Sequence, residues 1–151
     1  MERKKITISD LMAKKKSGRK ITMLTAYDYP TAQMIDQAGI DTILVGDLLG
    51  MVVLGYSSTV YVSMEEMIHR TKAVTRGTTY AFVIGNMPLM PYQADVGKAI
   101  ENAGRFIKEG GCDAVKLEGG SEVAPVVKAI VTAGIPLCAR ISGLHLKQQP
   151  C

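Results

Sequence analysis

Short apolar segments alternate with longer amphipathic segments along almost the whole chain, and this alternation limits the folds open to it. The pattern predicts strands over residues 21–25, 42–45, 80–84, 114–117 and 136–139, and helices over residues 9–16, 29–38, 63–77, 96–109 and 121–133. Nearly continuous apolar strands separated by helices are typical of parallel sheets with right-handed crossovers. We therefore expect an α/β fold, either a closed barrel or an open doubly wound sheet.

Polar side chains at the predicted strand ends favour the barrel. Asp47 follows the second strand, Asn86 follows the third, and Lys116 and Glu118 lie at the end of the fourth. Barrel enzymes gather residues from several adjacent strands at one rim, whereas a doubly wound sheet concentrates its site at one switch point. A complete barrel takes roughly 250 residues, and the chain has 151. We therefore expect the N-terminal part of a (β/α)8 TIM barrel, with about five strands over residues 1–140.

The charge and cysteine patterns argue against several other classes of protein. The net charge is +4, but the basic excess lies in residues 14–16 and 19–20, where no aromatic residues interleave for base stacking. We therefore expect no nucleic-acid partner. No stretch approaches the ~18 apolar residues of a membrane span, so we expect no membrane partner. The three cysteines lack the spacing of a disulfide framework or a zinc site, which favours the cytoplasm.

The residues at the strand ends have the chemistry of a magnesium site. Asp47 and Glu118 offer hard oxygen ligands, which suit Mg²⁺ better than zinc or copper. Alternatively, Asp47 caps a turn and Glu118 is an ordinary surface residue. Lys116 stands in an apolar strand, where its ammonium needs an anionic partner, either a bound substrate or a structural ion pair. The glycine-rich segment 46–56 matches neither the P-loop nor the dinucleotide fingerprint.

Three ordered runs of residues resemble the ketopantoate hydroxymethyltransferase family. They are Thr-Ala-Tyr-Asp-Tyr at residues 25–29, Leu-Val-Gly-Asp with Leu-Gly-Met within residues 44–51, and Val-Lys-Leu-Glu-Gly-Gly at residues 115–120. The resemblance covers residues from about 5 to 140. It implies a cytoplasmic (β/α)8 barrel, commonly a homodecamer, that uses Mg²⁺. It also implies transfer of a hydroxymethyl group from 5,10-methylenetetrahydrofolate to the keto acid 3-methyl-2-oxobutanoate, which gives ketopantoate for pantothenate biosynthesis.

The resemblance further implies roles for individual residues. The metal ligands that it implies are Asp47, Asn86 and Glu118. The residues that it places around the keto acid are Asp47, Leu48, Asn86 and Lys116, the last of which holds the substrate carboxylate. The glutamate that the family uses as general base would lie beyond residue 151, so no catalytic base is assigned in this chain.

The chain departs from the family pattern at positions expected near the site. The departures are Leu48 in place of serine, Asn86 in place of aspartate, Arg70 and Arg140 in place of histidines, Leu89 in place of phenylalanine, and Pro91 in place of a small polar residue. The asparagine removes one negative charge from a site whose ion is held mainly by charge, so we expect weak Mg²⁺ binding and an impaired enzyme. The alternatives are a non-catalytic half-barrel remnant or interaction fragment, and an unrelated phosphate-binding α/β module.

The last residues, 141–151, are expected to form an aberrant tail. The family continues after the fifth strand with a pattern like His-Ile-Gly-Leu-Thr-Pro-Gln, which this chain lacks. The segment that begins at Ile141 can be encoded by a DNA sequence that, when its reading frame is shifted by two bases, encodes Ile-Gly-Leu-Thr-Pro-Gln instead. We therefore interpret the tail as a frameshift product that ends a truncated chain.

Overall fold

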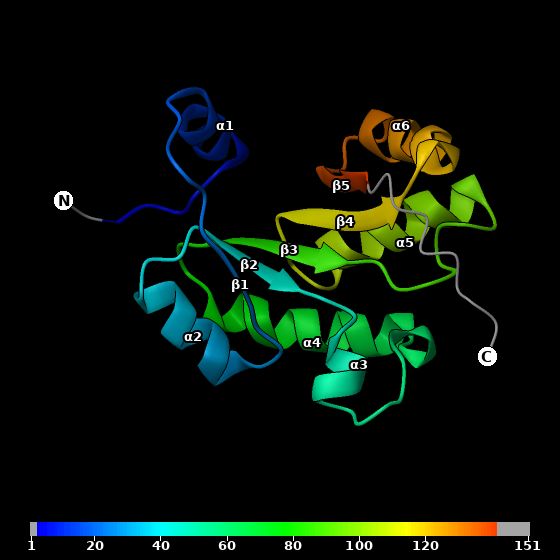
Figure 1. The fold of residues 1–151 in the computed structure, drawn as a ribbon, viewed down its shortest axis with the longest axis horizontal. Coiled ribbons are helices and arrows are strands. Elements are labelled where there is room, and N and C mark those ends of the chain that lie inside the picture. The colour runs from blue at the N-terminus through cyan, green and yellow to red at the C-terminus, as the bar shows by residue number, and fades with distance from the viewer. Residues whose placement is uncertain (1–2, 142–151) are drawn as a thin grey trace.

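Five parallel strands form one sheet in which their order in space is their order in the sequence, β1-β2-β3-β4-β5 (Figure 1). The structure is a computed structural model that describes residues 3–141, with side chains described to Ala139. A doubly wound sheet reverses its strand order at a switch point, and this sheet does not. The fold is therefore the α/β arrangement of a (β/α)8 barrel, of which it contains five strands, as the sequence predicts.

The strands and helices follow one another almost without exception. The strands are β1 (Met23–Thr25), β2 (Thr42–Val45), β3 (Phe82–Asn86), β4 (Ala114–Gly119) and β5 (Leu137–Ile141). The helices are α1 (Ile8–Lys16), α2 (Tyr29–Gln37), α3 (Leu49–Val52), α4 (Met64–Gly77), α5 (Val96–Lys108) and α6 (Ala124–Thr132). Short 3₁₀ turns, η1 (Thr59–Tyr61) and η2 (Ser121–Val123), precede α4 and α6.

Alternating side chains divide the sheet into two faces. On one face, residues such as Ile43, Val83 and Val115 join the main core beneath the helices that follow each strand. On the other face, Phe82 and Ile84 belong to a separate, smaller cluster. The first face is therefore the outer wall of the barrel, and the second face lines its interior.

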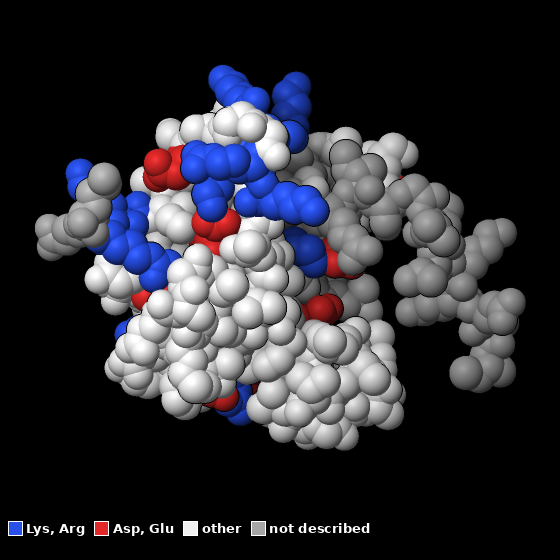
Figure 2. Space-filling model, turned by 60° about the vertical axis from the view of Figure 1, so that its left-hand side comes forward, with Lys and Arg blue, Asp and Glu red and all other residues white. Residues whose placement is uncertain are grey.

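The segment around α1 covers part of this interior face. Ile6 and Leu11 pack against the smaller cluster of β3 and β4 residues. Figure 2 shows that Lys and Arg side chains gather at the top of the view, over α1. Three of them, Lys14, Lys15 and Lys16, lie in the last turn of the helix, where cations favourably oppose its dipole. The three lysines of the basic excess that belong to α1 thus have a structural explanation at the end of that helix.

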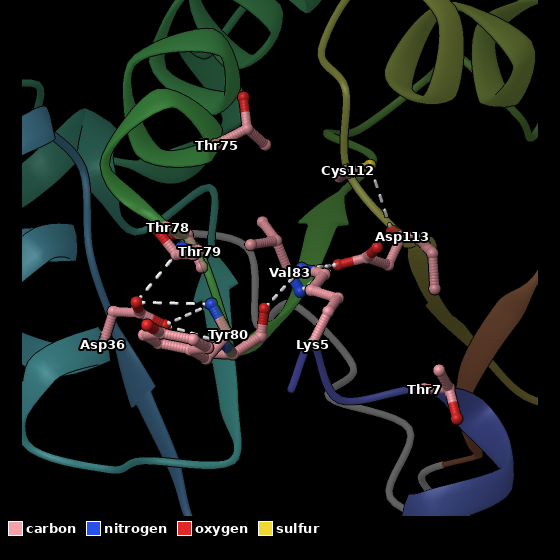
Figure 3. A network of polar contacts seen from close by, with 12 residues as sticks. Lys5, Thr7, Asp36, Thr75, Thr78, Thr79, Tyr80, Val83, Cys112 and Asp113 are labelled. Carbon is pink, nitrogen blue, oxygen red and sulfur yellow. Dashed lines mark hydrogen bonds and ion pairs between the residues drawn. The ribbon is translucent and has the colours of Figure 1, made fainter. Parts of the chain in front are cut away.

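Two carboxylates, one buried and one partly exposed, connect elements that are distant in sequence (Figure 3). Asp36, on α2, is 3% exposed and accepts hydrogen bonds from the backbone N–H groups of residues 79–81, just before β3. Asp113, just before β4, accepts one from the N–H of Val83 at 2.7 Å and pairs with Lys5 at 2.7 Å. Such carboxylates satisfy backbone donors that would otherwise be buried without partners.

Several expected boundaries are wrong in detail. The first strand is shorter than residues 21–25, and it is exposed rather than buried, because it lies at the edge of the sheet. The third strand begins at Phe82, because the Asp36 carboxylate holds the preceding residues. The cap of α1 is Thr7, which forms a capping box with Asp10, so the helix begins before residue 9. The sequence pattern did not predict α3.

Among residues 3–141, no helix is both long and apolar enough to span a bilayer.

Candidate functional site

The carboxyl ends of β2, β3 and β4 bring four polar residues to one rim. Asn86 ends β3 and lies opposite Lys116 in the parallel register, and Glu118 follows two residues later on the same face of β4. Asp47 comes two residues after the end of β2. Parallel strands end at a common edge, which is why residues so far apart in sequence meet here. We call Asp47, Asn86, Lys116 and Glu118 the rim cluster.

Lys116 lies at the centre of the rim cluster. Its ammonium forms an ion pair with the Glu118 carboxylate and donates a hydrogen bond to Asn86 Oδ1 at 3.1 Å. The Lys116 side chain is 14% exposed, whereas that of Glu118 is 47% exposed. The anionic partner that a lysine in this strand requires is therefore present within the protein. Whether Lys116 also holds a substrate stays a prediction.

The charges of Lys116 and Glu118 affect the pKa of Asp47. Burial raises the pKa of its carboxyl above the usual range, and the negative charge of Glu118 raises it further. The ammonium of Lys116 and the backbone N–H groups of Asp47 and Leu48 lower that pKa, but by less. The rim cluster therefore has an excess of negative charge, which a bound cation would relieve.

Close packing fixes the strand that presents Asn86. A Cβ atom on Gly85 would lie 2.4 Å from the ring of Phe106 on α5, so only glycine lets this helix approach β3 so closely. Asn86 itself is 2% exposed. Its position is therefore set by the packing of α5 and by the adjoining backbone, where the N–H of Met87 donates to the carbonyl of Lys116 at 2.8 Å.

The donor set of the rim cluster fits a hard divalent cation, with fewer charges than a strong site would have. It consists of the carboxylates of Asp47 and Glu118 and the amide oxygen of Asn86, and Mg²⁺ prefers such oxygen ligands. Within the described part of the chain, no group of three or more His, Cys, Asp or Glu residues could hold a metal. That Asp47, Asn86 and Glu118 are metal ligands stays a prediction.

Tyr92 belongs to this site although the sequence pattern did not single it out. It lies in the loop between β3 and α5, is 5% exposed, and donates a hydrogen bond to the backbone carbonyl of Glu118 at 2.8 Å. Burial raises the pKa of its phenol, and the charges of Glu118 and Asp47 raise it further, whereas its hydrogen bond to Glu118 lowers it. Its position shortly after a strand end was the available signal.

The residues that depart from the family pattern lie in different surroundings. Leu48 is 48% exposed at the start of α3 and makes no side-chain capping bond. Leu89 is exposed in the β3–α5 loop, as is its neighbour Met90. Arg70 lies on α4, where its charge acts on Asp28 at the start of α2. The side chain of Arg140 and residues 142–151 of the predicted tail, which begins at residue 141, lie outside the described residues.

The sequence matches one protein family over nearly its whole length. The model of that family, described as ketopantoate hydroxymethyltransferase, matches residues 5–149. The chain belongs to the ketopantoate hydroxymethyltransferase family. This membership removes the unrelated phosphate-binding module from consideration.

Curated members of the ketopantoate hydroxymethyltransferase family share more than half of their aligned residues with the chain. The 3-methyl-2-oxobutanoate hydroxymethyltransferase of Moorella thermoacetica is 58% identical over 140 residues, which are 93% of this chain and 52% of that protein. The enzyme of the same name from Acetivibrio thermocellus is 55% identical over 137 residues, which are 91% of this chain and 48% of that protein. The chain thus spans about half the length of the curated relatives that it matches.

Solved structures of more distant proteins share the fold. Phosphonopyruvate hydrolase in complex with oxalate and Mg²⁺ superposes with a TM-score of 0.72 at 16% identity, over 87% of this chain and 50% of that one. Oxaloacetate acetylhydrolase superposes with a TM-score of 0.70 at 13% identity, over 93% of this chain and 55% of that one. At these identities the likeness shows the fold alone.

Proposed function

We propose that the chain supplies the metal-binding and keto-acid-binding half of a 3-methyl-2-oxobutanoate hydroxymethyltransferase. The observation that carries the proposal is the rim cluster, which assembles two carboxylates, an amide and a lysine at the carboxyl ends of three adjacent strands. The family name implies a keto acid as substrate, and we propose 5,10-methylenetetrahydrofolate as the donor of the one-carbon unit. The proposed setting is the cytoplasm, which suits the free thiols of Cys112 and Cys138.

In this proposal Asp47, Asn86 and Glu118 would hold Mg²⁺, which would supply polarisation of the carbonyl of the keto acid. Lys116 would bind the substrate carboxylate, because its ammonium is largely shielded from water and lies beside the ligands. Without substrate, the Glu118 carboxylate balances the positive charge of that ammonium. On binding, the substrate carboxylate would replace Glu118 as its partner. Removal of a proton from the keto acid requires a base, and we assign none among the described residues.

The proposal predicts that the keto acid and the cation bind cooperatively. The carboxylate of the keto acid would draw Lys116 away from Glu118 and Asn86, and so free their oxygens for Mg²⁺. Calorimetric titration of the chain with Mg²⁺, with and without 3-methyl-2-oxobutanoate, measures this coupling. We expect at least a fivefold gain in affinity, typical of coupled sites. A Lys116→Met variant should lose that gain.

Equal Mg²⁺ affinity with and without the keto acid would contradict the proposed function. Such a result would favour a non-catalytic half-barrel instead, in which Lys116 and Glu118 form a structural ion pair. 3-Methylbutanoate, in which a methylene replaces the keto group, serves as the matched control ligand.

A further inference from the structure

Tyr92 reaches from one strand end of the rim to the next. It lies 26 residues before Glu118 in the sequence, yet its hydroxyl donates to the Glu118 carbonyl at 2.8 Å and lies 3.4 Å from the Glu118 N–H as an acceptor. One phenol thus engages both backbone polar groups of a single residue. A buried phenol needs a hydrogen-bond partner, and here both of its partners belong to the backbone of Glu118.

The backbone that Tyr92 holds is the part of β4 that presents Glu118. A Cβ atom on the next residue, Gly119, would lie 2.6 Å from the side chain of Val123, so the chain turns tightly against η2 here. The Glu118 side chain is about half exposed, and packing therefore does little to hold it. The position of its backbone is therefore one of the features that set the direction of this side chain, together with its contact with Lys116.

The loop that carries Tyr92 has an unusual backbone conformation. Met90 has a φ of 78°, a left-handed conformation that is uncommon for residues other than glycine. The amide of Asn102, on α5, donates to the carbonyl of Pro91 at 2.9 Å. The left-handed residue and this anchor direct Tyr92 inward, while Leu89 and Met90 stay exposed.

We propose that Tyr92 is a positioning residue that holds Glu118 in place to bind the divalent cation, an inference that rests on the proposed function. The loop bearing Tyr92 begins directly after Asn86, so the hydroxyl links the strand end of one candidate ligand to the backbone of another. Tyr92 does not touch the cation. It acts by restricting the distance and orientation between Asn86 and Glu118.

The test compares Tyr92→Phe with Tyr56→Phe. Each substitution removes one hydroxyl and leaves the ring; the Tyr56 hydroxyl bonds Glu66 Oε1 at 2.5 Å, in the capping box of α4. Two quantities are measured in the 151-residue chain: amide hydrogen exchange at Glu118 by NMR, and Mg²⁺ affinity by calorimetry. We expect Tyr92→Phe to speed exchange at Glu118 about tenfold and to weaken Mg²⁺ binding about fivefold, equivalent to the loss of one modest hydrogen bond. Tyr56→Phe should change neither quantity by more than about twofold.

Unchanged exchange at Glu118 in Tyr92→Phe would overturn the positioning role, whether or not the chain binds Mg²⁺. Faster exchange with unchanged Mg²⁺ affinity would also overturn the positioning role. Tyr92 would then stabilise the backbone at Glu118 without affecting cation binding. If the parent chain binds no Mg²⁺ while exchange still rises in Tyr92→Phe, the proposed function fails, and the cation-binding role of Tyr92 is rejected with it.

Discussion

The charges of the rim cluster determine how tightly it can hold a cation. Two carboxylates face one ammonium, and the third candidate ligand, Asn86, is neutral and already accepts a hydrogen bond from Lys116. A divalent ion entering this site must compete with Lys116 for Glu118. Mg²⁺ requires both negative charge and well-placed oxygens, so the low net charge of the cluster limits its affinity even where its oxygens are well positioned.

Asn86→Asp should strengthen Mg²⁺ binding. The added carboxylate lies at a buried strand end, where a charge is poorly screened. We expect a gain of about tenfold in affinity, or ~1.4 kcal/mol, measured by calorimetric titration with Mg²⁺. Gln33→Glu adds the same charge on the exposed face of α2 and should change the affinity little. Equal affinities in the parent and Asn86→Asp would remove Asn86 from the site.

The sequence could predict the rim cluster but not Tyr92. Asp47, Asn86, Lys116 and Glu118 are polar residues at the ends of apolar strands, and parallel strands end together, so local pattern and topology suffice to place them. Tyr92 reaches the site through the course of a loop that contains a left-handed methionine. No periodicity in the sequence describes such a loop, and an isolated tyrosine in it resembles any other partly apolar residue.

At the scale of elements, buried carboxylates fix how helices dock on strands. Asp36 accepts from three successive backbone N–H groups, and its removal would leave them without partners in the interior. We expect Asp36→Ala to lower the free energy of unfolding by ~3 kcal/mol, measured by urea denaturation. Asp95→Ala is the matched control, because it removes a single exposed hydrogen bond, the one that caps α5. It should lower the free energy of unfolding by ~1 kcal/mol. Equal losses would mean that water replaces Asp36 as acceptor.

The attachment of α1 should depend on pH through Asp41. Burial alone would raise the pKa of this carboxyl, but hydrogen bonds from Lys14 and Thr22 outweigh burial and lower it. A carboxyl whose folded pKa is depressed adds stability that is fully present above its unfolded pKa of about 4 and lost as the pH falls through the folded pKa. Asp41→Asn should therefore be less stable than the parent at neutral pH, and this gap should narrow below about pH 4.

Urea denaturation of Asp41→Asn and the parent, at neutral pH and at about pH 3, measures the gap. A gap of the same size at both pH values would show that Asp41 acts through packing, with no contribution from its charge. The lysine of this pair comes from α1 and the aspartate from the segment before β2, so the same measurement reports on the docking of α1.

Local chemistry made some element boundaries predictable, although the capping box of α1 was missed. The capping box of Ser63 and Glu66 begins α4 where the sequence predicts it. The sequence could not show that β1 is exposed, because exposure depends on which strand lies at the edge of the sheet. The shift of β3 likewise results from a long-range contact, in which Asp36 holds residues that their own propensity would assign to a strand.

At the scale of the molecule, the described sheet has two edges, β1 and β5. Met23 and Leu24 on β1 are 46% and 49% exposed, a large fraction for apolar side chains in a strand. Beyond β4, an apolar hollow of about 470 Å³ lies between the strand and α6, lined by Leu117, Val123 and Val127 among others. In a closed (β/α)8 barrel, further strands and helices cover such surfaces.

Turnover should require both the rim cluster and the half of the curated relatives' length that the chain does not span. General acid–base catalysis typically raises a reaction rate by about 10²- to 10⁴-fold, and no described residue is assigned as the base. We therefore expect ketopantoate formation from 3-methyl-2-oxobutanoate and 5,10-methylenetetrahydrofolate to stay at background for the chain, even with Leu48→Ser and Asn86→Asp. A chimera that continues after β5 with the remaining half of the Moorella thermoacetica enzyme should be active when it carries both substitutions, and weaker without them. Turnover of about 1 per second or more by the unmodified chain would show that neither the missing half nor the two substitutions are needed.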